Sequence, residues 1–263
     1  MRCLVVGDLH YCLPQYDWVV HVAPRYDLVI IAGDHLDLSS PVDGRAQTVV
    51  IQKYLELLSG KTKVVTCSGN HDLDSRNEEG EKTAAWIAEV SRAGVPADGE
   101  TIEMDGILFS ICAWWDGPIA RERIDAQLKR DAARRSGPWV WVHHAPAANS
   151  PTSWGGSRSH GDEVLSAWID LHQPDMVLSG HIHQSPFTKA GSWVDRIGKT
   201  LVFNMGQHLG APPPHIIIDT ELAEAAWLSA AGFQAIKLDQ IIERPLQHLA
   251  APPVWARAAE PPA

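Results

Sequence analysis

The chain has 263 residues, of which 45% are hydrophobic and 21% are charged, and its formal net charge is −10. This composition is typical of a folded globular protein and argues against a disordered one. The negative balance disfavours a nucleic-acid polymer as the ordinary ligand, because such binding depends on Lys and Arg contacts to phosphate. No segment reaches the roughly 18 uncharged apolar residues that a membrane span needs, so we expect no membrane partner.

The first residues enter an apolar run at once, in MRCLVVGD, without the basic region and apolar stretch of a signal peptide. The four cysteines show no CxxC spacing, and three of them lie in or beside apolar runs. Cysteines in such positions are typical of reduced thiols in a protein core. Both features predict a cytoplasmic protein.

Short apolar runs and helical patterns alternate along the first two thirds of the chain. The apolar runs are rich in β-branched or aromatic residues and too short for helices, which predicts buried strands at 3–8, 28–34, 63–70, 107–113, 139–144 and 176–181. Apolar residues spaced about 3.6 apart predict helices at 45–59, 81–93, 119–135 and 162–172. This alternation predicts a largely parallel or mixed sheet that is covered by helices.

After residue 185 the pattern changes to strands without long helices, at 200–204, 215–219, 225–230 and 233–238. We interpret these strands as a second sheet packed on the first. Residues 1–244 are then a single domain. Residues 245–263 are rich in Pro and Ala, which is typical of a tail or a docking arm.

Polar side chains follow five of the predicted strands at the point where each strand ends. They belong to the blocks GDLH (Asp8, His10), GDHLD (Asp34), GNHD (Asn70, His71, Asp72), HHAP (His143, His144) and GHIH (His181, His183). Ligands of open α/β sheets bind beyond the carboxyl ends of the strands, so we expect these side chains to converge. Carboxylate, amide and imidazole groups together suit Mn, Fe or Zn. Each block alone could be a polar surface turn; five of them at strand ends argue against that reading.

These five blocks, in this order, resemble the signature of the calcineurin-like metallophosphoesterases: D-x-H, GD-x-x-D, GNH-D/E, a strand-end His, and GH-x-H. The resemblance extends from residue 4 to about 206, since FNMG at 203–206 also resembles the Asn-x-Gly turn that follows GH-x-H in many members. It implies an α/β fold, specifically a four-layer α/β/β/α sandwich with two mixed β-sheets.

The resemblance also implies two metal ions in adjacent sites. One site would consist of Asp8, His10, Asp34 and His183, and the other of Asp34, Asn70, His143 and His181. The shared carboxylate of Asp34 would hold the ions at the roughly 3.5–4 Å that suits phosphoryl transfer, and a hydroxide between them would be the nucleophile. His71 would protonate the leaving alkoxide or stabilise the transition state, and Asp72 would orient His71 or raise its basicity through a hydrogen bond.

Several neighbours of these residues have two readings. Either histidine of HHAP could be the ligand; we favour His143, the first polar residue after the strand, which leaves His144 as a substrate contact or a hydrogen-bond donor behind the ligands. Trp114 and Trp115 could stack on a base or an apolar leaving group, or could be ordinary core or rim aromatics. We interpret two further positions as structural, His35 as a loop histidine and Asp37 as a carboxylate outside the ligand set.

The loop at 148–161 is polar and glycine-rich and follows HHAP directly. It could be a lid from which Arg158 or His160 reaches a substrate phosphate, or simply a mobile loop, and we favour the mobile loop slightly.

The sequence therefore predicts a metal-dependent phosphodiesterase that acts on a small molecule or a nucleotide. The first alternative is a phosphomonoesterase for small metabolites or phosphoproteins, although GDHLD lacks the arginine that the protein-phosphatase branch carries in GD-x-V-D-R-G. An inactive binding scaffold and a DNA nuclease are weaker alternatives, because every ligand position is present and the charge balance is acidic.

Overall fold

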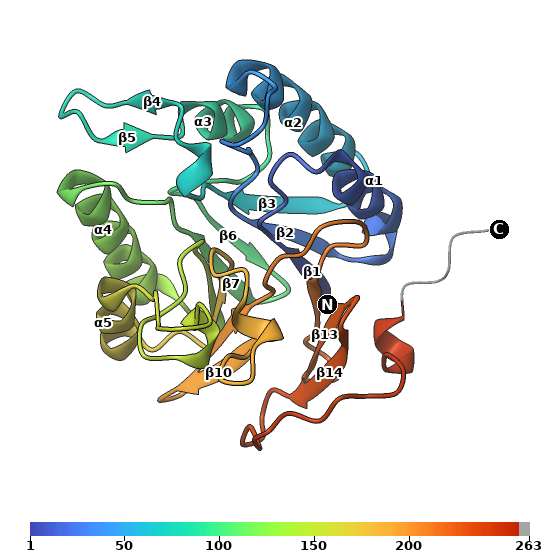
Figure 1. Ribbon diagram of the computed structural model, residues 1–263. Coiled ribbons are helices and arrows are strands. Elements are labelled where there is room, and N and C mark those ends of the chain that lie inside the picture. The colour runs from blue at the N-terminus through green and yellow to red at the C-terminus, as the bar shows by residue number, and fades with distance from the viewer. Residues whose placement is uncertain (258–263) are drawn as a thin grey trace.

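The computed structural model describes residues 1–257, which form two six-stranded sheets and a small hairpin (Figure 1). The first sheet has the order β14-β13-β12-β1-β2-β3, with β1 (Arg2–Val6), β2 (Leu28–Ala32), β3 (Lys63–Cys67), β12 (His215–Asp219), β13 (Glu224–Ser229) and β14 (Gly232–Lys237). The second has the order β10-β11-β9-β8-β7-β6, with β6 (Thr101–Met104), β7 (Ile107–Ile111), β8 (Trp139–Val142), β9 (Met176–Ser179), β10 (Val194–Ile197) and β11 (Thr200–Asn204). The hairpin pairs β4 (Ser75–Arg76) with β5 (Lys82–Thr83).

Both sheets are mixed: the first is antiparallel from β14 to β1 and parallel from β1 to β3, and the second has a parallel centre with an antiparallel strand at each edge. Strands β1, β2 and β3 are parallel, as are β7, β8, β9 and β11, whereas β12 and β10 pair antiparallel with β1 and β11. The carboxyl ends of the parallel strands carry the polar blocks identified in the sequence. Both sheets therefore carry candidate ligand residues at the carboxyl ends of their parallel strands.

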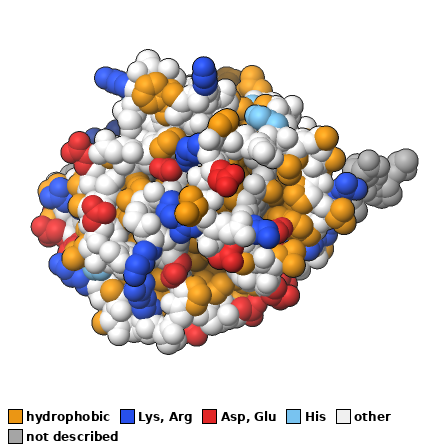
Figure 2. Space-filling view, turned by 90° about the horizontal axis from the view of Figure 1, so that it is seen from below, with side chains coloured by type: hydrophobic (Ala, Val, Ile, Leu, Met, Phe, Trp, Pro, Cys, Tyr) orange, Lys and Arg blue, Asp and Glu red, His pale blue; other side chains and the backbone are white. Residues whose placement is uncertain are grey.

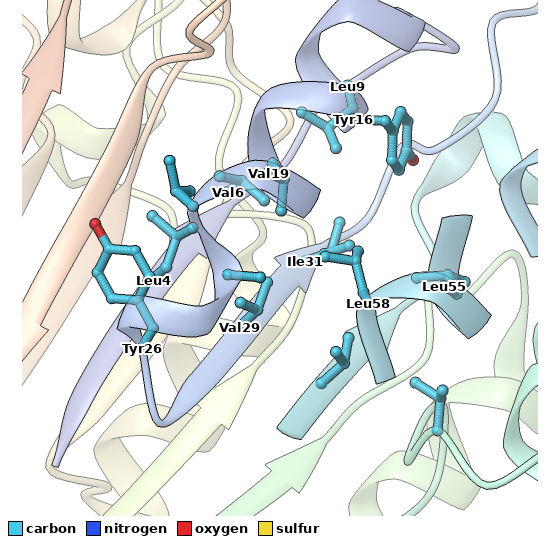
Figure 3. Close-up of a cluster of buried hydrophobic side chains, with 14 of the residues drawn as sticks. Leu4, Val6, Leu9, Tyr16, Val19, Tyr26, Val29, Ile31, Leu55 and Leu58 are labelled. Carbon is cyan, nitrogen blue, oxygen red and sulfur yellow. The ribbon is translucent and has the colours of Figure 1, made fainter. Parts of the chain in front are cut away.

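Helices cover the two sheets, and apolar side chains fill the spaces between these elements. The helices are α1 (Leu13–Val22), α2 (Gly44–Ser59), α3 (Ala85–Arg92), α4 (Pro118–Arg134) and α5 (Glu163–His172), with short 3-10 turns η1 (Ala23–Arg25), η2 (Asn70–Asp72), η3 (Pro151–Ser153), η4 (Ser185–Phe187) and η5 (Val254–Ala256). One core cluster joins the first sheet to α1, α2 and α3 (Figure 3), a second joins the two sheets, and a third joins the second sheet to α4 and α5. The mixed α/β class with two mixed sheets is as predicted.

The late strands do not form the separate second sheet that the sequence suggested. Strands β12, β13 and β14 extend the first sheet, because β12 pairs with β1 from Arg2↔Asp219 to Val5↔Ile216. Strand β11 instead joins the sheet of β8 and β9. The strands predicted after residue 185 are present, but β10 was missed, and the sequence does not reveal which sheet edge each late strand joins.

Two helix assignments also differ from prediction. Helix α1 was not anticipated; it begins at Leu13 with a proline in its first turn, where the missing N–H of proline costs nothing. The helix predicted at 81–93 starts at Ala85, because residues 82–83 pair in the hairpin. Helix α2 matches its prediction closely, with the Asp43 side chain accepting a hydrogen bond from the N–H of Arg45 at its N-terminus.

The described part of the predicted tail packs on the domain. Leu246 lies against the core between the sheets, Leu249 pairs with Phe233 of β14, and Ala256 is buried beside the first sheet. Residues 258–263 lie outside the described part of the chain. None of the helices in residues 1–257 combines the length and the apolarity needed to cross a lipid bilayer.

Candidate metal centre

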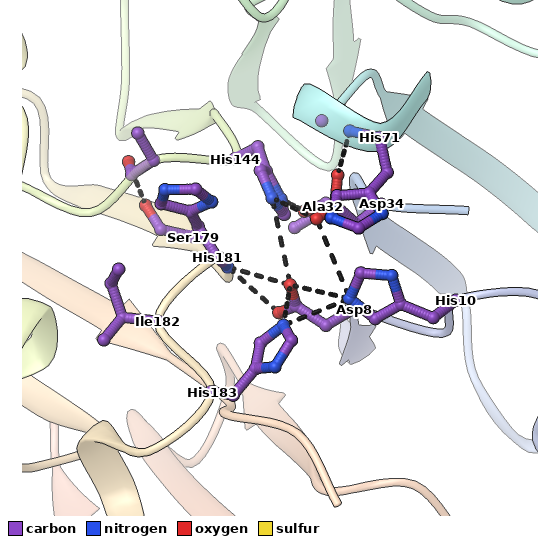
Figure 4. Close-up of polar contacts among 12 residues, drawn as sticks. Asp8, His10, Ala32, Asp34, His71, His144, Ser179, His181, Ile182 and His183 are labelled. Carbon is purple, nitrogen blue, oxygen red and sulfur yellow. Dashed lines mark hydrogen bonds and ion pairs between the residues drawn. The ribbon is translucent and has the colours of Figure 1, made fainter. Parts of the chain in front are cut away.

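The polar residues that end β1, β2, β3, β8 and β9 meet between the two sheets (Figure 4). Four of them have backbones in the left-handed region: Asp8 (φ 51°), His10 (φ 41°), Asp34 (φ 52°) and His181 (φ 69°). Residues other than glycine rarely adopt this conformation, and they keep it where the surrounding structure enforces it, often at functional sites. Sharp turns thus direct these side chains back across the strand ends.

The first group of potential metal ligands consists of Asp8, His10, Asp34 and His183. One ligand atom from each lies within 4.8 Å of the others. His183 Nε2 is 3.3 Å from Asp8 Oδ1, and His10 Nε2 is 3.1 Å from His183 Nε2. Two imidazole nitrogens and two carboxylates that converge in this way provide the donor set of a borderline divalent cation.

The second group consists of Asp34, His144 and His181, whose ligand atoms also lie within 4.8 Å of one another. His144 Nε2 is 3.1 Å from Asp34 Oδ2, and the His144 and His181 ring centroids are 5.2 Å apart. Asp34 belongs to both groups. This arrangement fits the bridging role expected for its carboxylate.

The structure corrects the choice between the two histidines of HHAP. In β8, Val140 and Val142 face the core between the sheets, whereas Trp139 and Trp141 face the helices. Side chains alternate along a strand, so the residue at 144 continues the inner face and His143 the outer one. His144, not the predicted His143, therefore joins the cluster, and its Nδ1 lies 2.7 Å from the Ala32 carbonyl oxygen. His143 is buried outside both groups.

Asn70 also fits a ligand role, although it stands outside the His and Asp groups. Its Oδ1 atom is buried without a hydrogen-bond partner among the described residues, and a buried polar atom in that state is costly unless something else binds it. The next residue anchors the turn, because the His71 N–H donates to Asp34 Oδ1 at 2.9 Å. A cation beside Asp34 would satisfy the orphaned oxygen.

Three glycines make room for this donor set. A Cβ atom on Gly69 would collide with the Asp34 carboxylate, one on Gly180 would collide with Asp8, and one on Gly33 would lie 2.5 Å from His144 Nδ1. Gly33 also has a φ of 83°, which other residues rarely adopt. The glycines of GDHLD, GNHD and GHIH are therefore required by close packing against a candidate ligand.

Opposite charges within the cluster shift one another's pKa values. Burial opposes ionisation of Asp34, but His144 holds the pKa of that carboxyl well below its usual range. Burial likewise opposes the charged form of His144, yet the Asp34 carboxylate raises the pKa of His144 to about 10. The pKa of His181 falls to about 4 through burial and the positive charge of His144. The cluster thus concentrates negative charge that a bound cation would neutralise.

His71 and Asp72 have separate roles in the structure. His71 borders a cavity of about 270 Å³ together with His10 and His183, and its ring centroid is 4.6 Å from that of His10. The Asp72 carboxylate binds backbone groups rather than the His71 ring: it accepts the N–H groups of His35, Leu36 and Gly69 at 2.9, 3.1 and 2.8 Å. Asp72 is fully buried and fixes the two ligand loops against each other.

Of the tryptophan pair, only Trp114 faces the cluster. Its ring centroid is 5.1 Å from that of His181 and 5.7 Å from that of His144. Trp115 turns toward the outer helices, where its Nε1–H donates to Asp162 at 2.8 Å and Arg121 stacks over its ring. Trp114 thus borders the second ligand group, and Trp115 has a structural role.

The proposed lid residues are not brought to the cluster. Arg158 and His160 are exposed, and their contacts lie within their own loop: Gly155 donates to the Arg158 carbonyl oxygen, and His160 donates its N–H to Ser153. His35, in contrast, is a buried core residue; its ring nitrogens contact Tyr16 Oη at 2.8 Å and Thr66 Oγ1 at 2.7 Å, and burial lowers its pKa to about 3.

Sequence reasoning missed Gln15, which supports the rim of the cavity. Its buried amide donates to the carbonyl oxygens of His208 and Gly210, at 2.9 and 2.7 Å. These bonds hold the loop from which Gln207 and Leu209 line the cavity. No motif signals such a residue, because a glutamine in the unanticipated α1 shows its role only through contacts nearly 200 residues away.

The sequence comparison with protein families agrees with this geometry. Residues 1–185 match the model of the calcineurin-like phosphoesterases. The chain belongs to this family. Comparison with curated proteins gave no significant sequence match.

Solved structures of low sequence identity share the fold of this family member. TT1561 of Thermus thermophilus is 14% identical, with a TM-score of 0.56 over 90% of this chain and 98% of that one. The purple acid phosphatase PPD1 from yellow lupin (Lupinus luteus) seeds is 13% identical, with a TM-score of 0.55 over 90% of this chain and 51% of that one. GAP50, described as the anchor in the inner membrane complex of Plasmodium, is 10% identical, with a TM-score of 0.51 over 95% and 88%.

Proposed function

We propose that this phosphoesterase is a dinuclear metal-dependent phosphodiesterase for a small molecule or a nucleotide. The observation that carries the proposal is the sharing of Asp34 by two groups of potential ligands. Asp8, His10 and His183 would hold one ion with Asp34, and Asn70, His144 and His181 the other. Mn, Fe and Zn all suit these donors. Such ions would stabilise negative charge on the phosphate oxygens. They would also lower the pKa of bound water, so that hydroxide is available as a nucleophile at neutral pH.

The protein's own contribution begins with orientation of the ligands. The His144 ring is held from behind by the Ala32 carbonyl oxygen, which leaves Nε2 facing Asp34. Asp8 accepts the His181 N–H with both carboxylate oxygens, each at 3.0 Å. Such contacts fix the rotamers of ligands and reduce the cost of ordering them on binding.

His71 is the proposed proton donor to the leaving alkoxide. The Leu38 N–H approaches its Nδ1 at 3.5 Å, and an imidazole that accepts at Nδ1 carries its proton on Nε2. The ring borders the cavity beside His10 and His183. A protonated Nε2 there could donate to an ester oxygen as its bond to phosphorus breaks.

A diester is favoured over a monoester by the charge of the cavity. Among the described residues, no Lys or Arg lines it, and GDHLD lacks the arginine of the protein-phosphatase branch. A monoester carries up to two negative charges and a diester one. Phosphomonoester hydrolysis remains the alternative activity of the same site.

Two other functions have less support. The face in Figure 2 intersperses basic and acidic side chains, without the continuous basic surface that binding to a nucleic-acid polymer requires. A scaffold role, such as the anchor function in the name of GAP50, would not need the complete donor set or His71.

The test is hydrolysis of bis(p-nitrophenyl) phosphate by protein reconstituted with Mn²⁺ or Zn²⁺, with metal content measured on the same sample. Asn70→Ala and His71→Ala should each lower kcat by two orders of magnitude or more, whereas Asp170→Asn, on the exposed surface of α5, should not. A metal-loaded protein that hydrolyses neither this diester nor p-nitrophenyl phosphate would refute the proposal.

A further inference from the structure

The cavity of about 270 Å³ beside His10, His71 and His183 has two walls made of residues outside the ligand set. Asp37 and Ser39, from the loop between β2 and α2, form one wall. Gln207 and Leu209 form the other. A substrate group attached to the phosphate would have to occupy the space between these walls.

Each wall is fixed by a buried glutamine. Gln47 accepts the Asp37 N–H at 2.8 Å, donates to the Asp37 carbonyl oxygen at 3.0 Å, and donates to that of Val42 at 2.9 Å. Gln15 holds the opposite loop through the two bonds described above. Both glutamines are at most 2% exposed. The walls are therefore preorganised, and the Asp37 carboxylate has a defined position at the cavity.

Among residues 1–257, Asp37 is the one charged side chain of the lining outside the candidate ligands and His71. Its Oδ1 accepts the Ser39 N–H at 2.8 Å, which helps to hold the carboxylate in place. No Lys or Arg of the described residues lines the cavity to offset it. The next residue, Leu38, contacts the His71 ring through its N–H, which places Asp37 close to the reacting region.

We infer that Asp37 selects the charge of the substrate: the cavity takes phosphodiesters whose substituent is neutral or cationic and rejects substituents that add negative charge. This inference rests on the proposed function and specifies its substrate class. A carboxylate in the wall of the cavity repels a second negative charge on the ester and attracts a positive one. The effect adds to the charge of the metal ions, which attract every phosphate ester alike.

Three chromogenic esters with the same leaving group test the inference. These are p-nitrophenyl phosphorylcholine, with a cationic substituent, bis(p-nitrophenyl) phosphate, with a neutral one, and p-nitrophenyl phosphate, which carries an additional negative charge. In Asp37→Asn, kcat/KM for the monoester should rise about two- to fivefold relative to the neutral diester, and that for the choline ester should fall by a similar factor. Asp37→Lys should shift both ratios further in the same directions.

A binding measurement provides a readout that does not depend on turnover. Inorganic sulfate, an unreactive dianion, should bind metal-loaded Asp37→Asn about two- to fivefold more tightly in a calorimetric titration, and the difference should shrink at high salt. Asp170→Asn makes the same change in net charge on the exposed face of α5 and should change neither the ratios nor the sulfate affinity.

The outcomes separate the two proposals. Hydrolysis with unchanged ratios in both Asp37 variants would refute charge selection and leave the phosphodiesterase standing. A wild-type preference for the monoester over both diesters would also refute it. Absence of hydrolysis of all three esters would refute the proposed function, and unchanged sulfate binding would then refute the role of Asp37 as well.

Discussion

His144 Nε2 lies 3.1 Å from Asp34 Oδ2, while the ring of the preceding residue, His143, is buried on the other side of β8. This relationship makes the two histidines a matched pair for testing the metal centre. His144→Asn should reduce the bound metal by about one ion per chain, measured by plasma mass spectrometry after reconstitution. His143→Asn should keep the full metal content, provided that the variant remains folded by circular dichroism. Equal losses in the two variants would contradict the assignment.

The choice between these histidines also shows how far the sequence could lead. The glycine-flanked blocks at strand ends predict Asp8, His10, Asp34, His181 and His183, because several independent signals coincide there. The alternation of inward and outward side chains in WVWV would have selected the histidine at 144 as well. The first polar residue after a strand is a poorer guide than the face on which it lies.

Other features depend on contacts that no local pattern encodes. The pairing of β12 with β1 joins residues more than 200 positions apart, so the late strands read equally well as a separate sheet. Asp72 seemed to belong with its neighbour His71, but the turn at η2 directs its carboxylate to the backbone of residues 35, 36 and 69. Long-range pairing and turn geometry therefore set the limits of prediction from the sequence.

The histidines of GHIH should serve different ions. His183 contacts Asp8 and His10 in the first ligand group, and His181 stands with His144 in the second. Titration of metal-free His181→Ala and His183→Ala with Zn²⁺, followed by calorimetry, should show one lost binding step in each. The remaining step should differ in affinity between the variants. If both variants retain a Zn²⁺-binding step of the same affinity, the assignment of His181 and His183 to different ions is wrong.

The close packing of Gly69 on Asp34 predicts a large effect of a single methyl group. The backbone at Gly69 has a φ of −111°, which alanine tolerates, so Gly69→Ala tests only the collision of Cβ with the carboxylate. Displacing a ligand in this way should weaken metal binding roughly ten- to a hundredfold. Gly44→Ala is the control, because a Cβ there meets no atom within 4 Å. Similar metal affinities in the two variants would show that the loop adapts freely.

Substitutions at Asp72 and at His71 should affect different properties: the first should lower stability, and the second should lower catalytic activity. Burial and the charge of Asp34 raise the pKa of Asp72, while the hydrogen bonds from the N–H groups of Gly69 and Leu36 oppose this shift. Asp72→Asn leaves at least one of these buried donors without an acceptor, so the free energy of unfolding should fall by about 1–3 kcal/mol in urea titrations. His71→Asn, at the cavity, should change stability little but lower kcat. Loss of kcat without loss of stability in Asp72→Asn would favour the orienting role that the structure does not support.

We expect the stability of the protein to depend on pH through His215, a buried residue outside both ligand groups. It is 3% exposed, and burial lowers its pKa from 6.5 to about 4, although the bond between Nδ1 and the Pro213 carbonyl oxygen opposes the shift. The unfolded chain therefore takes up the proton at higher pH than the folded protein does. The stability associated with neutral His215 is complete above pH 6.5 and is lost as the pH falls toward 4.

The comparison of wild type with His215→Asn isolates this contribution, since the asparagine amide can replace Nδ1–H as a donor to Pro213. Between pH 7 and pH 5, wild type should lose about 2 kcal/mol more of its free energy of unfolding than the variant does. Urea titrations at both pH values on metal-free protein would measure the difference, with His208→Asn, at a partly exposed histidine, as the control. Parallel losses in wild type and His215→Asn would mean that His215 is protonated as readily in the folded protein as in the unfolded chain.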